Sequence, residues 1–429
     1  MEEVRGFVME EAKKADSLAV MWREIQGANN WEGLLDPFNP ILKKEVIKYG
    51  EFAQLCYDYF DCNAYSKNYG KCRYSRREWF QQEEVPSYGY EITKYVYACT
   101  HVHLPRYFLR CLAPVTWKSE ATWMGFIAVV KEKEKIERLG RRDIVVAWRG
   151  SETSLEWVED LHNWLVPAGF EDEEEDNESI MVESGFLNVY TAEIKNAKHN
   201  HRSARELVLT EIRRLLQEHK NEELSITLCG HSLGAALALL SAYDIGLMVA
   251  NLKCHISITV FAFGCPRVGN KTFVDRIDSL NIKVLRIVNV NDMVTRVPGI
   301  MLNENIQLLN FLKFVLDWIP LFYYHAGVEI YVDSESSPYL KHTRNLVFHH
   351  SLEVYLHLLD GSIGEGKAFR SAGRDPALVN KYCDLLVDKL FIPPYWWQEA
   401  YKGLVKNEEG RWSQRNREED SDDDTSQCD

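Results

Sequence analysis

Residues 224–240, with the sequence LSITLCGHSLGAALALL, form the stretch that decides the fold. Their first part, Leu224–Cys229, predicts a buried strand, and the run that continues from Ala235 predicts a helix. Between the two lies Gly230–Gly234, the only GxSxG pattern in the chain. A serine on so sharp a turn brings neighbouring backbone segments into contact, and the two glycines leave room for them. The stretch therefore predicts a tight turn that presents Ser232.

Outward from this stretch, short β-branched runs alternate with longer helical segments. The runs are Phe126–Val130, Asp143–Trp148, Ser225–Cys229, Ile256–Phe263 and Val284–Val290. Such alternation predicts a mostly parallel central sheet with helices on both faces. Together with the GxSxG turn, it predicts the α/β-hydrolase fold.

Four parts are expected along the chain. Residues 1–90 have mainly helical patterns and are expected to form an N-terminal extension, and residues 91–360 the α/β-hydrolase catalytic core. Residues 361–406 are expected to form a C-terminal extension packed on that core. Residues 407–429 are polar and acidic with almost no apolar content, which predicts a disordered tail.

The serine needs two partners for chemistry. A serine hydroxyl is a weak nucleophile unless a histidine takes its proton and an acid orients that histidine. In this fold the three residues follow the chain in the order serine, acid, histidine. Asp292 lies two residues after the run Val284–Val290 and is the candidate acid. His349 and His350 both precede an amphipathic helical run, so the residues alone leave both open as the base.

The reaction also needs donors for the oxyanion of the tetrahedral intermediate. One is expected from the backbone of Leu233, directly after the serine, and one from a loop that follows an earlier strand. Ser151 lies in such a loop, because Arg149-Gly150-Ser151 follows the run Asp143–Trp148. We therefore expect Ser151 and Leu233 to form the oxyanion hole.

The charge of the chain is concentrated in two segments. The formal net charge is −14, but residues 171–178 and 418–429 hold seven acids each and no Lys or Arg. The remainder has 50 acids and 50 bases, which gives no support to nucleic-acid binding. The spacing of the cysteines and histidines matches no zinc pattern, so no metal is assigned.

The sequence also suggests a location. The N-terminus begins Met1-Glu2-Glu3 and lacks both the basic-then-apolar pattern of a signal peptide and the acid-poor character of a transit peptide, so we expect a cytoplasmic protein. The most apolar stretch, residues 306–324, is interrupted by charged residues and a proline, so no transmembrane span is expected. Its helical pattern favours burial and leaves peripheral membrane contact open.

A series of motifs along the chain resembles the plant branch of the class 3 (fungal-type) lipases, in particular its cytosolic phospholipase A1 group. The resemblance covers most of the sequence. It rests on residues 22–27 (WREIQG), 33–37, 72–77 (CRYSRR), 139–143 (LGRRD), 149–151 (RGS), 230–234 (GHSLG), 266–270 (PRVGN) and 394–397 (PYWW). By motif, the resemblance implies Ser232 as nucleophile, Asp292 as acid and His350, in His350-Ser351-Leu352-Glu353, as base, with His349 as the alternative.

The resemblance implies a serine acyl hydrolase that cleaves the acyl ester of glycerophospholipids at the sn-1 position through an acyl-serine intermediate. Its partner would be a glycerolipid substrate at a lipid–water interface, and no cofactor is expected because protein groups and water supply the chemistry. A neutral-glyceride lipase or a general carboxylesterase is the alternative within enzymes. A non-catalytic α/β-hydrolase scaffold with a signalling role is the alternative of another class.

Residues 155–165 carry a further expectation. Leu155, Val158, Leu161 and Leu165 stand at helical spacing, and in the family this segment corresponds to a lid over the site. The same pattern would suit a helix packed on the core, and both interpretations stay open.

Overall fold

The computed structural model of the chain describes most of the residues between 18 and 397, and two short segments beyond. The described residues are 18–63, 66–79, 88–99, 121–151, 164–171, 179–193, 202–252, 255–298, 322–343, 345–361, 369, 373–397, 404–406 and 411–414. Three segments of interest in the sequence lie outside them: most of the lid candidate (152–163), the acidic run from 172 to 178, and residues 299–321 of the apolar stretch.

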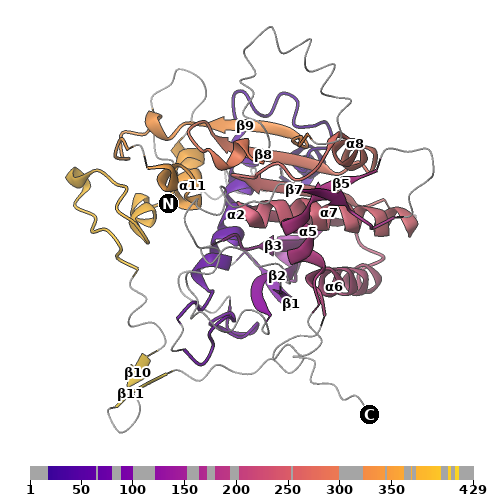
Figure 1. The fold of residues 1–429 in the computed structure, drawn as a ribbon, viewed down its shortest axis with the longest axis horizontal. Coiled ribbons are helices and arrows are strands. Elements are labelled where there is room, and N and C mark those ends of the chain that lie inside the picture. Colours follow the sequence, from indigo (N-terminus) through magenta and orange to yellow (C-terminus); the bar gives the residue numbers. More distant parts are fainter. Residues whose placement is uncertain are drawn as a thin grey trace, which may run out of the picture.

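A seven-stranded sheet forms the centre of the molecule, in the order β1-β2-β3-β6-β7-β8-β9 (Figure 1). Strands β3, β6, β7, β8 and β9 run parallel, whereas β1 and β2 are antiparallel additions at one edge. The strands are β1 Tyr90–Ala98, β2 Thr122–Val130, β3 Arg142–Trp148, β6 Leu224–His231, β7 Ser257–Phe263, β8 Lys283–Asn289 and β9 Val328–Val332. This confirms the expected mostly parallel sheet.

Helices cover both faces of this sheet. One face is covered by α2 (Pro40–Asp58) and α11 (Leu352–Gly361), and the other by α5 (Ser184–Thr191), α6 (Ala204–Glu218), α7 (Leu233–Asn251) and α8 (Lys271–Ser279). Because side chains alternate along a strand, Phe261 and Phe263 of β7 pack with α2, while Val260 and Ala262 pack with α7. The chain therefore has the fold of an α/β hydrolase.

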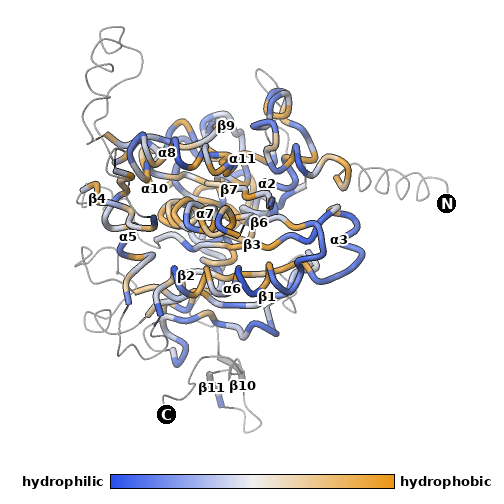
Figure 2. The backbone as a smooth tube through the Cα atoms, turned by 90° about the vertical axis from the view of Figure 1, so that its right-hand side faces the viewer, coloured by the Kyte–Doolittle hydropathy of each residue, from blue (hydrophilic) through white to orange (hydrophobic). Residues whose placement is uncertain are grey.

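Helix α7 is apolar all round and lies inside the molecule. Figure 2 shows it at the centre in hydrophobic colours, whereas α3 (Lys133–Leu139) at the periphery is hydrophilic. Within the part of the chain that the structure describes, α7 is the one helix long and apolar enough to cross a membrane, and almost all of it is buried in the fold. Burial between sheet and helices explains its composition.

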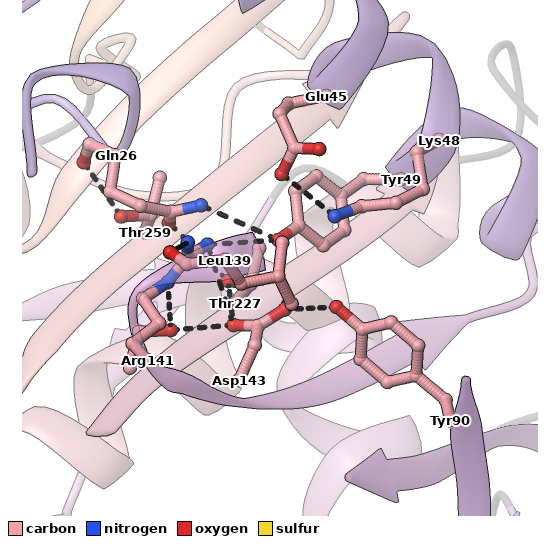
Figure 3. Close-up of polar contacts among 11 residues, drawn as sticks. Gln26, Glu45, Lys48, Tyr49, Tyr90, Leu139, Arg141, Asp143, Thr227 and Thr259 are labelled. Carbon is pink, nitrogen blue, oxygen red and sulfur yellow. Dashed lines mark hydrogen bonds and ion pairs between the residues drawn. The ribbon is translucent and has the colours of Figure 1, made fainter. Parts of the chain in front are cut away.

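A buried polar network fixes the N-terminal part of the chain to the amino ends of the strands (Figure 3). The Asp143 carboxylate of β3 accepts hydrogen bonds from the hydroxyls of Tyr49, Tyr90, Ser225 and Thr227 at 2.6–2.8 Å. Its ion-pair partner Arg141 lies 4.0 Å away and is itself buried. Tyr49 comes from α2, so this helix is attached to the sheet by a hydrogen bond as well as by apolar packing.

Shorter elements complete the structure. They are β4 Leu165–Pro167 with β5 Met181–Glu183, the 3-10 helices Val294–Arg296, Ser334–Ser336, Pro376–Asn380 and Asp388–Leu390, α10 Leu346–His349, and β10 Leu404–Lys406 with β11 Trp412–Gln414. Of the expected tail over 407–429, the structure describes only residues 411–414, where β11 pairs with β10. The four-part division of the chain stays a prediction.

Candidate active site

Ser232 lies on the turn between β6 and α7. Its backbone has φ 59° and ψ −126°, and positive φ is uncommon for residues other than glycine. The Ser232 N–H donates to the carbonyl of Phe263 at the end of β7 over 3.0 Å, which fixes the turn to the neighbouring strand. Strained backbone of this kind persists where the surroundings enforce it, and it occurs mainly at functional sites.

The two flanking glycines allow this turn to form. A Cβ atom on Gly230 would lie 2.2 Å from the carbonyl oxygen of Gly234. A Cβ on Gly234 would lie 2.6 Å from the carbonyl oxygen of Trp148, at the end of β3. Both distances are far below van der Waals contact, so the structure gives the glycines the steric role that the sequence predicted.

Asp292 and His350 meet at the same edge of the sheet. His350 follows α10, and its Nδ1 lies 2.6 Å from Oδ2 of Asp292, just beyond the end of β8. Asp292 is fully buried, and its Oδ1 accepts from the backbone N–H of Val294 over 2.8 Å. A hydroxyl from α11 also donates to this carboxylate, because Tyr355 Oη lies 2.6 Å from Oδ2. Three donors therefore hold the acid in one orientation.

His349, the alternative base, has other partners. Its Nδ1 lies 2.8 Å from the Ser334 hydroxyl, and its Nε2 lies 3.2 Å from the carbonyl oxygen of Thr343. The structure therefore brings His350, and not His349, into contact with Asp292. The role of His350 as base stays a prediction based on this geometry.

Several polar atoms in this region are buried without a hydrogen-bond partner among the described residues. They are Ser232 Oγ, His350 Nε2, His231 Nε2 and Ser151 Oγ. Buried polar atoms almost always have partners, so four such atoms at one edge of a sheet indicate a binding site for a molecule that supplies the partners. Hydrogen bonds between catalytic groups often form only when substrate is bound, which suits Ser232 and His350.

The loop after β3 passes directly against Ser232. A Cβ atom on Gly150 would lie 2.4 Å from the carbonyl oxygen of His231 and 3.2 Å from Cβ of Ser232. Ser151 is the next residue, and Leu233 is the first residue of α7, whose backbone N–H has no intrahelical partner. The two expected oxyanion donors thus belong to the two segments that meet at Ser232.

Residues that the sequence did not indicate complete the site. Tyr355 was part of an apolar helical period, which shows that it faces the core but not that its hydroxyl reaches Asp292. Gly264 adopts φ +53°, and a Cβ there would lie 3.2 Å from both Asp292 Oδ2 and the His350 ring. His231 was counted only as the variable position of GxSxG, and its ring lies 4.5 Å from that of His350.

Burial changes the acid–base properties of two of these groups. Burial, and next the carboxylate of Asp292, raise the pKa of Tyr355 well above its ordinary value, so its hydroxyl stays a donor. Burial, and next the neighbouring His350, lower the pKa of His231 well below its ordinary value, and a contact with the His350 backbone opposes them only in part. His231 is therefore neutral at neutral pH.

The fold and these contacts define the class of protein: an α/β hydrolase with Ser232 on the tight turn between β6 and α7. The sequence pattern of the family described as lipase (class 3) matches residues 145–302. Phospholipase A1-Igamma1, chloroplastic, of Arabidopsis thaliana is 46% identical over 416 residues, which are 95% of this chain and 80% of that protein. Phospholipase A1-II 1 of Oryza sativa is 38% identical over 408 residues, which are 94% and 98% of the two chains.

The chain therefore belongs to the class 3 lipase family, among its plant phospholipase A1 members. A solved triacylglycerol lipase from Penicillium expansum is also similar, at 17% identity and a TM-score of 0.40 over 68% of this chain and 80% of that one. The family assignment rests on the sequence relatives alone.

The prediction of a cytoplasmic protein is wrong. Three relatives at 45–46% identity, phospholipases A1-Igamma1, A1-Igamma2 and A1-Igamma3 of Arabidopsis thaliana, are named chloroplastic and point to the plastid instead. The cytosolic subgroup is unsupported for the same reason. The prediction relied on the acidic composition of the first residues, and this local feature does not outweigh similarity over most of the chain.

Proposed function

We propose that the chain hydrolyses the acyl ester of glycerophospholipids, at the sn-1 position, with Ser232 as nucleophile. The observation that supports this most strongly is the 2.6 Å contact of His350 with the buried Asp292, at the sheet edge where Ser232 occupies its strained turn. The substrate class follows from the relatives, which are named phospholipase A1 and share most of the chain.

In the proposed reaction, His350 Nε2 takes the proton of the Ser232 hydroxyl as Oγ attacks the ester carbonyl carbon. The carbonyl oxygen becomes an oxyanion, which the backbone N–H groups of Ser151 and Leu233 stabilise. His350 then gives its proton to the leaving lysolipid oxygen as the ester bond breaks. Water, activated by His350, resolves the acyl-serine and releases the fatty acid.

Asp292 keeps the proton of the neutral imidazole on Nδ1, so that Nε2 faces the serine as an acceptor. When His350 gains its second proton, the carboxylate stabilises the imidazolium. Tyr355 and the Val294 N–H hold the carboxylate in place, which fixes the orientation of the base in turn.

The test is release of fatty acid and lysolipid from phosphatidylcholine whose sn-1 and sn-2 chains can be distinguished. We expect the sn-1 acid to be released, and Ser232→Ala to lower the rate by several orders of magnitude. Because the relatives point to the plastid, galactolipids belong in the same substrate panel, together with triacylglycerol. Preferential cleavage of triacylglycerol or short esters would favour the neutral-glyceride or carboxylesterase alternative. A folded protein that cleaves no ester would favour the scaffold alternative.

A further inference from the structure

Helix α2 lies far from the catalytic residues in sequence but reaches them in space. It ends at Asp58, and the hydroxyl of Tyr57 in its last turn lies 2.9 Å from Nδ1 of His231, the residue before the nucleophile. The same hydroxyl crowds Gly150, where a Cβ atom would lie only 2.1 Å from it. Tyr57 therefore contacts the nucleophile turn on one side and the expected oxyanion loop on the other.

His231 connects Tyr57 to the candidate base. Its ring lies against that of His350, with centroids 4.5 Å apart and planes inclined by 36°. His350 is thus held at Nδ1 by Asp292 and on one face by His231. The position of the His231 ring depends in turn on Tyr57, because a hydroxyl at 2.9 Å fixes the rotation of the imidazole that it contacts.

We propose that Tyr57 is a positioning residue for His350 and acts through His231. The contact of the Tyr57 hydroxyl with Nδ1 keeps the His231 ring in one orientation against His350, while burial, and next His350, keep this ring neutral by lowering its pKa. A neutral neighbour leaves His350 free to accept the proton of Ser232, whereas a charged one would oppose the imidazolium that forms. The N-terminal helix would then be part of the catalytic apparatus, outside the segment that matches the family pattern.

The surroundings of His231 agree with this role. Among the described residues, the titratable groups that face its ring are Tyr57 from α2, His350 after α10 and Tyr355 from α11, whose ring centroid is 6.1 Å away. Asp292 lies beyond His350 and Tyr355 and binds both. Among the described residues, no carboxylate contacts the His231 ring directly, and only a contact with the His350 backbone favours the charged form of His231.

A second tyrosine of α2 provides a matched control. Tyr49 lies two turns earlier, is buried, and donates its hydroxyl to Asp143 at the other end of the sheet. Tyr49→Phe and Tyr57→Phe each remove one hydroxyl group, with the hydrogen bonds that it makes, from the same helix. If both hydroxyls only stabilise the fold, the two variants should affect catalysis alike.

The experiment measures kcat, KM and the pH dependence of kcat/KM on a soluble short-chain ester and on phosphatidylcholine vesicles. We expect Tyr57→Phe to lower kcat about tenfold with little change in KM. In the parent, log kcat/KM should rise with a slope of one on the acid side, because one base accepts the Ser232 proton. In Tyr57→Phe this acid limb should move along the pH axis, because the His231 ring no longer has a fixed position against His350. Tyr49→Phe should keep the parent's kcat and acid limb and unfold at a lower temperature.

Two further measurements keep the proposal open to refutation. In the His231→Gln background, Tyr57→Phe should no longer lower kcat, because the ring through which Tyr57 acts on His350 is absent. If Tyr57→Phe does not fold, the His231→Gln variant is the test. A kcat below that of the parent with an unaltered KM supports the proposal, and an unaltered kcat overturns it. The proposal would also be overturned if Tyr57→Phe kept the acid limb of the parent's pH profile, or if Tyr49→Phe and Tyr57→Phe lowered kcat equally.

The inference rests on the proposed function, but different results would contradict the inference and the proposed function. Should Ser232→Ala retain the parent's activity, the proposed function itself fails. If Ser232→Ala is inactive but Tyr57→Phe matches the parent in kcat and in acid limb, only the role of Tyr57 fails.

Discussion

Two fully buried aspartates lie at opposite ends of the same parallel sheet. Asp143, near the start of β3, and Asp292, just after β8, both accept hydrogen bonds from tyrosine hydroxyls. Asp143 has Arg141 as its ion-pair partner, whereas Asp292 has His350. The arginine keeps its charge at every accessible pH, but the imidazole can gain and lose a proton. Under the proposed function, the partner therefore makes one end of the sheet static and the other reactive.

The two ends also differ in how many of their buried polar groups have hydrogen-bond partners. Around Asp143, four hydroxyls donate to the carboxylate, and Arg141 has its own acceptors at Leu139 and Ser225 (Figure 3). Beyond Asp292, His350 Nε2 and Ser232 Oγ remain buried without partners among the described residues. A network in which every polar group has a partner contributes stability, whereas groups without partners are available to bind a substrate.

The largest effect should separate the two adjacent histidines. We expect His350→Ala to lower kcat by about 10⁶, the scale found when the base of a serine triad is removed. His349→Ala should leave kcat near the parent value and lower the free energy of unfolding by about 1–2 kcal/mol, because it removes the contacts of the His349 ring with the Ser334 hydroxyl and the Thr343 carbonyl. Ester hydrolysis and urea unfolding on both variants measure this. The reverse pattern would assign the base to His349.

The two aspartates should show the next largest contrast. Asp292→Asn should lower kcat about 10⁴-fold by favouring the wrong tautomer of His350, with little loss of stability. Asp143→Asn should lower the free energy of unfolding by about 3–5 kcal/mol, because Arg141 remains buried without its counter-charge. Its kcat in the folded state should be unchanged. A large kcat loss in Asp143→Asn without unfolding would remove the distinction between the two ends.

A methyl group placed between acid and base should have a smaller effect. Gly264→Ala puts a Cβ 3.2 Å from both Asp292 Oδ2 and the His350 ring, and we expect kcat to fall roughly tenfold to a hundredfold as the pair shifts. Gly33→Ala is the control, since Gly33 also has positive φ but nothing within 4 Å of the added atom. It should cost about 1 kcal/mol of stability and leave kcat intact. Equal kcat values in the two variants would contradict the placement of Gly264.

Acid should destabilise the two ends through different groups. Burial, and next Arg286, lower the pKa of His325 to about 3, and its Nε2 contacts the carbonyl of Thr295 near Asp292. The unfolded chain binds this proton near pH ~6.5, so the stability from neutral His325 is present above that pH and is lost towards pH 3. At Asp143, burial raises the pKa, but Arg141, Lys48 and the hydroxyl donors together outweigh it and lower the pKa, so the contribution of Asp143 to stability is lost only below about pH 4.

Urea unfolding between pH 7 and 4 tests this difference. We expect the decline in stability to be shallower in His325→Gln, which can keep a donor for Thr295. The Asp143→Asn variant should keep the parent's slope over that range. Parallel pH profiles for His325→Gln and the parent would show that His325 is not the group responsible.

The local part of the site could be predicted from sequence, because short-range geometry determines it. The turn at Ser232 and the need for Gly230 and Gly234 follow from a few adjacent residues. The end of β8 likewise predicted that Asp292 lies at the sheet edge where Ser232 is found. Strand β1 was not among the predicted runs, because half-buried polar residues interrupt its apolar pattern at the antiparallel edge of the sheet.

The contacts between distant residues could not be predicted. Tyr57 reaches His231 across 174 positions, and its place in the apolar period of α2 gives no information about its hydroxyl. His349 and His350 are neighbours at the end of α10, and a rotation of one residue along that turn decides which ring faces Asp292. Only the packing of α10 and α11 on the sheet determines that rotation.

The most direct test of the reactive end is covalent trapping with a fluorophosphonate, in which the serine oxygen attacks phosphorus and fluoride leaves. Peptide mass spectrometry on the intact chain should find one phosphonyl group on Ser232, none in Ser232→Ala, and much slower labelling in His350→Ala, with Tyr49→Phe labelled at the parent's rate. Ester cleavage that persists without an adduct on Ser232, or an adduct on another residue that abolishes activity, would contradict the account.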